Sequence, residues 1–121
     1  MELELLTAFK SELDSLSIES AFRLYAGDIY PYMTYEYYET NVTHEDGGTT
    51  GELLCEIWTR NTFAELIDIK DRLKEHFKQK NIMVGNNVYH FDYVSSTPED
   101  TGDAELKKVQ VNIITKYWKG A

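Results

Sequence analysis

The most constraining feature of this chain is a run of nine residues, Tyr30 to Tyr38, that contains five of its nine tyrosines. Tyrosine and threonine favour a pleated, half-buried surface, and Pro31 can stand only at the start or the edge of a strand. The run therefore predicts a strand over 33–40 that is entered through a proline. A tyrosine ring is large and its hydroxyl is polar, which suits a surface that a partner covers. An ordinary edge strand with a wet aromatic face is the alternative interpretation.

Length and composition limit what the protein can be. A chain of 121 residues predicts one domain, 1–121, and its apolar fraction of 42% is ordinary for a folded protein. No run of 18 apolar residues is present, so we expect no membrane span. The first residues, Met1 to Glu4, are acidic and do not predict a signal peptide. Cys55 is the only cysteine, which excludes an internal disulfide, and its apolar strand predicts a buried, inert thiol. Together these features fit an intracellular place of synthesis.

The formal charge of −9 is unevenly placed along the chain. Residues 1–60 carry 12 acidic and 3 basic side chains, whereas residues 61–121 carry 9 of each. An anionic protein repels phosphate, which argues against specific binding of nucleic acid. Solubility is the ordinary explanation of such acidity, and a surface that DNA passes without sticking is the more specific one.

Two segments have helical periodicity. Residues 2–16 and 62–79 place apolar side chains three and four positions apart, and Thr62 with Glu65 forms a capping-box pattern at the start of the second segment. The expected buried stripes are Leu3, Leu6, Phe9, Leu13 and Leu16 in the first helix and Phe63, Leu66, Ile67, Leu73 and Phe77 in the second.

Three further segments, 52–59, 88–94 and 105–118, alternate between apolar and polar residues and predict strands. The last is long enough to project from the domain or to pair with 88–95 as an extended hairpin. The segment 17–27 fits either a helical extension or a short strand. The expected fold is therefore α+β, with an antiparallel sheet of about four to five strands and two main helices packed on one face.

Two polar segments connect these strands. Residues 44–51 contain three glycines and predict a flexible hairpin loop, which is not a phosphate cradle because it precedes a strand and has no lysine. Residues 95–103 are polar and acidic and predict a second mobile loop. We expect both loops to order on assembly. The residues assigned to these assembly loops are Asp46, Gly47, Gly48, Pro98, Glu99 and Asp100.

No motif predicts catalysis, a cofactor or a metal site, so we expect no enzyme. None of the three histidines has a partner at zinc-site spacing, and the acids of 99–103 lack the order of a calcium loop. His90 and Asp92 share a strand face and could act as an acid–base pair if an opposite wall supplied a nucleophile. A small intracellular ligand-binding or hydrolytic domain with a cleft near His90 and Asp92 is therefore the alternative. A third possibility is an adaptor that binds another protein by strand addition.

The order of these elements resembles the tail-completion proteins of long-tailed bacteriophages, the tail terminator or head–tail joining family. The similar features are an N-terminal helix, the strand Tyr-Pro-Tyr-Met-Thr-Tyr at 30–35, the glycine loop, the strand Glu52–Thr59 that ends in Ile-Trp-Thr, the helix 62–79, the acidic loop after Phe91-Asp92-Tyr93 and the closing strand 105–118. Such proteins form a ring, usually six-fold, that caps the tail tube, joins the tail to the head and lets DNA pass.

The resemblance implies a structural protein of the virion tail or neck that is synthesised in the cytoplasm of the bacterial host. Its implied partners are copies of itself, the tail tube protein and a head-completion or connector protein, with DNA passing through unbound and no membrane involved. Ring closure requires two different patches on each subunit, and we expect the tyrosine strand and the C-terminal strand to supply them. The expected interface residues are Tyr32, Tyr35, Tyr37, Tyr38, Trp58 and Tyr117.

Overall fold

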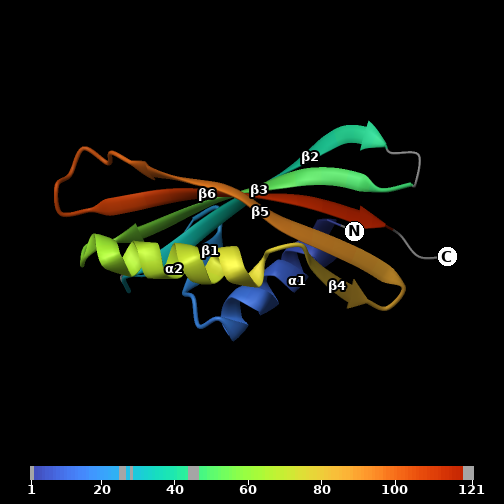
Figure 1. Ribbon diagram of the computed structural model, residues 1–121, viewed down its shortest axis with the longest axis horizontal. Coiled ribbons are helices and arrows are strands. Elements are labelled where there is room, and N and C mark those ends of the chain that lie inside the picture. Colours follow the sequence, from blue (N-terminus) through green and yellow to red (C-terminus); the bar gives the residue numbers. More distant parts are fainter. Residues whose placement is uncertain (1, 25–26, 28, 44–46, 119–121) are drawn as a thin grey trace.

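The computed structural model describes residues 2–24, 27, 29–43 and 47–118. Within these ranges the chain forms two helices and six strands (Figure 1). The elements are α1 (Glu2–Ser15), β1 (Ser20–Phe22), β2 (Tyr32–Thr43), β3 (Thr49–Thr59), α2 (Phe63–His76), β4 (Lys80–Val84), β5 (Asn87–Glu99) and β6 (Lys107–Trp118). Neither of the two helices in this described part combines the length and the apolar character needed to cross a membrane.

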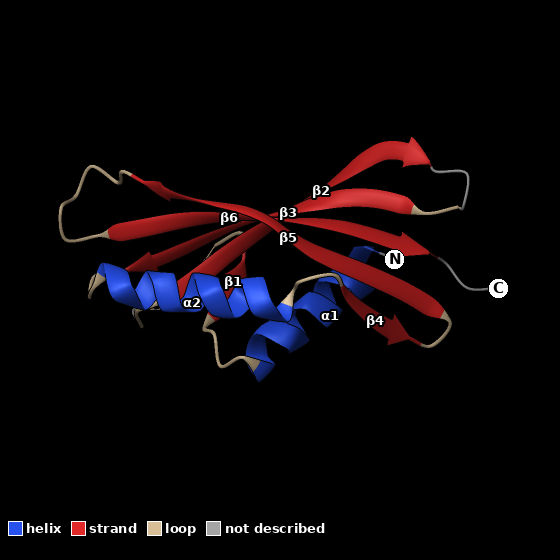
Figure 2. Ribbon diagram, viewed as in Figure 1, coloured by secondary structure: helices blue, strands red, loops and turns tan. Residues whose placement is uncertain are grey.

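The strands form one mixed sheet in the order β1-β2-β3-β6-β5-β4. β1 pairs with β2 in parallel, and the other neighbouring pairs are antiparallel. Both helices lie on the same face of the sheet (Figure 2). The predicted α+β class is therefore confirmed, but the sheet has six strands and one parallel pair rather than four to five antiparallel strands.

The first unpredicted feature of the sheet is its parallel pair. β1 lies in the segment that the sequence left open between helix and strand, and it pairs with residues 33–35 of β2. Met33 N donates to Glu19 O at 2.8 Å, and Arg23 N donates to Tyr35 O at 2.9 Å. These long-range hydrogen bonds make the segment a strand, because three residues are too few to specify a strand by their own pattern.

The second unpredicted feature is β4. The sequence extended the second helix to residue 79, whereas α2 ends at His76 and Lys80 begins a strand. The two-residue connection Gly85–Asn86 joins β4 to β5, and Gly85 has a φ of 60°. A positive φ at the first central position is the conformation of a type II′ hairpin turn, which glycine adopts without steric cost.

The core lies between the helices and the sheet and is built around aromatic rings. The ring centroid of Phe9 is 5.2 Å from those of Tyr35 and Phe77 and 5.8 Å from that of Phe91. Strand alternation was predicted well: β3 buries Leu53, Cys55 and Ile57, and β6 buries Val109, Val111, Ile113, Thr115 and Tyr117.

The predicted helix stripes need correction. α1 buries Leu5, Phe9 and Leu13, whereas Leu3 is 78% exposed. Residues four apart share a helix face, while Leu3 lies about 200° around the helix from Leu5. In α2 the buried residues are Leu66, Ile69 and Leu73, and the predicted members Phe63 and Ile67 are exposed.

The predicted capping box is also absent from the start of α2. Thr62 occupies the N-cap position but makes no side-chain capping hydrogen bond. Glu65 instead accepts from Thr59 Oγ1 at 2.9 Å and from Asn61 Nδ2 at 3.0 Å. The Glu65 carboxylate therefore joins the start of α2 to the end of β3. The buried Thr59 hydroxyl is the donor that replaces the backbone N–H of Thr62 expected in a capping box.

Candidate assembly surface

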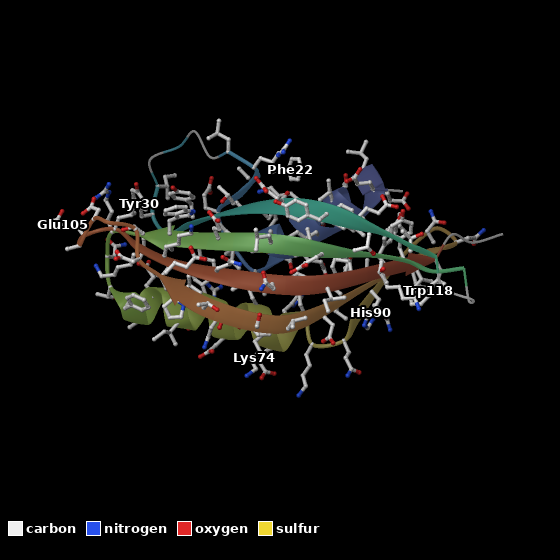
Figure 3. All side chains as sticks on the ribbon, turned by 90° about the horizontal axis from the view of Figure 1, so that it is seen from above. Phe22, Tyr30, Lys74, His90, Glu105 and Trp118 are labelled. Atoms are coloured by element: carbon white, nitrogen blue, oxygen red, sulfur yellow. The ribbon has the colours of Figure 1, made fainter. Side chains whose placement is uncertain are left out.

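The sheet face opposite the helices is called the open face here, and it is lined by alternate residues of β2, β3, β6 and β5. Figure 3 looks onto it, with the helices behind the strands. The strand register arranges its side chains in rows across the sheet. The rows are Tyr32–Trp58–Lys108–Glu99, Thr34–Glu56–Gln110–Thr97, Glu36–Leu54–Asn112–Ser95 and Tyr38–Glu52–Ile114–Asp92.

One end of the open face carries a stack of rings and cations. Tyr32 stacks on Trp58 with 6.2 Å between the ring centroids, and the centroid of Tyr30 is 5.3 Å from that of Tyr32. Lys108 Nζ lies 4.6 Å from the Trp58 centroid, and Arg60 Cζ lies 5.8 Å from that of Tyr30. Each contact is favourable, and together they hold this end of the sheet in one arrangement.

Lys108 is the centre of this end. Its ammonium lies 3.3 Å from a Glu56 carboxylate oxygen and 3.2 Å from one of Glu99, and its side chain is only 14% exposed. Burial alone would lower the pKa of Lys108, but the two carboxylates outweigh it and raise that pKa above its ordinary value. The cation is therefore neutralised within the subunit and does not present a basic patch.

The six expected interface residues divide between the two faces. Tyr35, Tyr37 and Tyr117 are at most 9% exposed and belong to the core beneath the helices, so they offer little surface to another subunit. This corrects the expectation for these three, because alternation in a strand that is covered on one side turns every second ring inward. The other three, Tyr32, Tyr38 and Trp58, lie on the open face.

The expected assembly loops are also partly corrected. Pro98 and Glu99 belong to β5, which pairs with β6 as far as Glu99 after a register shift between Tyr93 and Ser95. Asp100 is exposed and accepts a bond from Gly102 N at 2.9 Å. In the glycine loop, Gly47 is exposed with a φ of 80°, Gly48 is buried, and Asp46 lies outside the described residues.

The candidate acid–base pair lies at the opposite end of the open face from Tyr30 (Figure 3). His90 Nδ1 is 2.6 Å from Asn81 Oδ1, and Asp92 Oδ1 accepts from Gln79 N at 3.1 Å. Both side chains therefore bond to the edge of the sheet. Neither side chain lines the two clefts beside the helices or the small one beside Arg23.

The two larger clefts lie beside the helices. One of about 430 Å³ lies between α1, the Pro31 segment and α2, and a shallower one of about 450 Å³ lies along α2. Arg72 lines both, donates to Leu16 O at 2.7 Å and lies 3.3 Å from Asp68. Its guanidinium therefore joins the end of α1 to α2.

Chemically reactive groups are few in the described part of the chain. Cys55 is fully buried, and burial raises the pKa of its thiol. No group of three metal-ligating side chains occurs among the described residues. The chain matches no protein-family model and no curated protein.

The sequence analysis does not identify every residue of this surface. The clearest omission is β4, although Gly85–Asn86 between two alternating segments is a hairpin signal. Tyr30, Arg60 and Lys108 were also not assigned, because the stack depends on the register between β2, β3 and β6. No local pattern carries that information.

Proposed function

We propose that this protein is a non-enzymatic structural subunit that assembles into a ring of about six copies, and that the ring is a tail terminator or head–tail joining ring of a long-tailed bacteriophage. The observation that carries the proposal is the open face, a wide sheet surface that no helix covers in the described part of the chain. The resemblance in element order supports the same assignment.

The charge of the open face suits a surface that DNA passes. Its rows and the adjoining Lys116 contain two lysines against five carboxylates, those of Glu36, Glu52, Glu56, Asp92 and Glu99. Lys108 is already paired with two of these carboxylates. If the open face lines the bore of the ring, its net negative charge repels the phosphates of DNA and prevents sticking.

The aromatic end of the open face suits contact with the next ring of the virion. Tyr32 and Trp58 lie where β3 ends and where the segment 100–106 connects β5 to β6. Arg60 reaches Asp103 of that segment at 3.3 Å, so the connection is held against the stack. Amphipathic rings at a rim offer contact area to the tail tube protein or to the connector protein.

The test is the mass of the purified protein by light scattering over a wide concentration range, followed by electron microscopy. We expect a closed ring with a central opening that does not retard duplex DNA on a gel. A double variant, Glu36→Lys with Glu52→Lys, keeps the fold because both side chains are at the surface, and it should make the ring bind DNA in a salt-dependent way. A chain that stays monomeric, or a variant ring that still ignores DNA, contradicts the proposal.

A further inference from the structure

The sheet has two bare edges at the same end. β1 covers only residues 33–35 of β2, so in the described part of the chain residues 36–43 have β3 on one side and no strand on their outer side. β4 ends the sheet on the other side. Figure 1 shows β2 and β4 at opposite borders of the sheet. An unpaired edge strand is a ready template for pairing with another chain.

One row of paired residues runs across the sheet from the bare edge of β2 to β4. The Cα register runs from Glu39 through Gly51, Thr115 and Phe91 to Lys80. A copy placed beside this one without a shift along the strands therefore brings Lys80 next to Glu39. Such a contact joins unlike edges at one level, which is the condition for a closed ring rather than a climbing filament.

The strand directions make this contact parallel. Every step from β2 to β4 across the sheet is antiparallel and there are four of them, so the two edge strands run the same way. A neighbour related by rotation about an axis along the strands therefore presents its β4 parallel to β2.

At the level of Glu39 and Lys80 the backbone groups are in phase for such a parallel pair, whereas beyond Glu39 the register of β2 shifts before Thr43. Met33 and Tyr35 bond outward to β1, so the same alternation turns Tyr37 and Glu39 toward the bare edge. The two-residue turn directs Lys80 toward β5 and leaves Asn81 at the other edge. In a parallel pair, a residue whose backbone N–H and C=O point into the seam lies opposite a residue whose backbone groups point away from it. Glu39 and Lys80 have this relation.

We propose that the bare edge of β2 in one copy pairs in parallel with β4 of the next copy, with Glu39 opposite Lys80. This inference rests on the proposed function, because it names the contact that closes the ring. The seam brings the acidic Glu39 beside the basic Lys80, and Lys78 precedes Lys80 by two residues. Among the described residues, Lys80 Nζ approaches a Glu12 carboxylate oxygen at 3.9 Å, and Glu39 accepts a hydrogen bond from Tyr117 Oη at 3.3 Å.

β1 is not a competing seam. Its outer carbonyl groups are already occupied, because Lys10 Nζ donates to Ser20 O at 2.8 Å and Leu24 N donates to Phe22 O at 2.8 Å. A strand of three residues with both of these acceptors used offers little to a second chain. The exposed side chains Tyr38, 52% exposed, and Met83, 70% exposed, lie instead beside the proposed seam.

Charge exchange tests the pairing. Glu39→Lys and Lys80→Glu each put like charges across the seam, and we expect each to weaken association by about tenfold per contact. An equimolar mixture of the two variants should recover assembly, because each faces the opposite charge of the other at both edges. The double variant should recover it as well. Lys74→Glu and Glu52→Lys are matched controls away from the seam and should leave assembly unchanged.

Cysteine pairs test the register. Glu39→Cys and Lys80→Cys place thiols within disulfide reach if the residues are neighbours across the seam, and the buried Cys55 stays out of the reaction. We expect mixed single variants to give a cross-linked dimer and the double variant to give a ladder that ends at the ring. Dimers formed by either single variant alone overturn the pairing of unlike edges.

The two levels of the proposal fail in different ways. A ring seen by light scattering that responds neither to charge exchange nor to oxidation overturns the seam and leaves the proposed function standing. An open cross-linked ladder without closure supports the seam and contradicts the ring. A chain that neither associates nor cross-links contradicts both.

Discussion

Gly51 is the position where a single methyl group should disturb the fold most directly. It lies in β3 on the helix-covered side, beneath the ring of Tyr37. A Cβ at this position would lie 2.3 Å from the Tyr37 hydroxyl oxygen and 2.6 Å from two carbons of the ring. The ring is buried, so it cannot move aside without displacing its neighbours. Gly51→Ala should therefore destabilise the protein.

The magnitude follows from two opposing effects. Forcing extra atoms into a packed core costs about 1–3 kcal/mol, whereas alanine is favoured over glycine within a strand by about 0.5–1 kcal/mol. The midpoints of these ranges leave a net loss of about 1 kcal/mol in the free energy of unfolding, which lowers Tm by about 3–6 °C for a chain of this size.

The assay is urea unfolding of Gly51→Ala, Tyr37→Leu and the double variant. The double variant should lose less stability than the sum of the single losses, by about 1 kcal/mol, because the smaller side chain makes room for the methyl group. Gly85→Ala is the control: it meets no atom within 4 Å but has a φ of 60°, so Tyr37→Leu should not rescue it. A neutral Gly51→Ala, or additive losses, would refute the steric argument.

Three further predictions concern single contacts. Tyr89 donates a short hydrogen bond to Glu4, and this bond, followed by that from Asn87, lowers the pKa of Glu4 below 4.5. A lowered folded-state pKa contributes stability above about pH 4.5 that is lost as the pH falls through the folded value, so Tyr89→Phe should show a shallower acid-side loss in urea unfolding from neutral pH to about pH 3. Glu65→Ala should cost about 1 kcal/mol by removing its two side-chain bonds, whereas the exposed Glu75→Ala should stay within about 0.5 kcal/mol in the same measurement. Cys55 should react with a thiol reagent only as fast as the protein unfolds, because it is fully buried; fast labelling of the native protein would contradict the structure.

The sequence predicted those elements whose signal is local. Alternation over 52–59 identifies the buried side of β3 because the period of two is written in consecutive residues. β1 could not be predicted in the same way, since its three residues become a strand only by bonding to β2. The helix stripes were placed with an error at Leu3 and Ile67, because a broad apolar set does not fix which of its members faces the sheet.

The candidate site shows the same division. Alternation placed Met33, Tyr35 and Tyr37 on one face, but only the position of the helices decides which face a partner can reach. The row from Glu39 to Lys80 depends on the registers of four successive strand pairs. The residues next to Glu39 or Lys80 in the sequence therefore cannot predict that both lie in one row.

The division of the sheet into a helix-covered face and an open face separates stability from assembly. The largest buried side chains, Tyr89, Phe9, Phe77 and Phe91 among them, are packed on the helix side. Glu39 is exposed and Lys80 is half-buried, and their contacts within the subunit are a 3.3 Å hydrogen bond from Tyr117 Oη to Glu39 and a 3.9 Å approach of Lys80 to Glu12. Because hydrophobic burial is the dominant favourable contribution to folding, substitutions at these two positions should change the free energy of unfolding by no more than about 1 kcal/mol. Loss of assembly in such a variant can then be attributed to the seam itself and not to a damaged subunit.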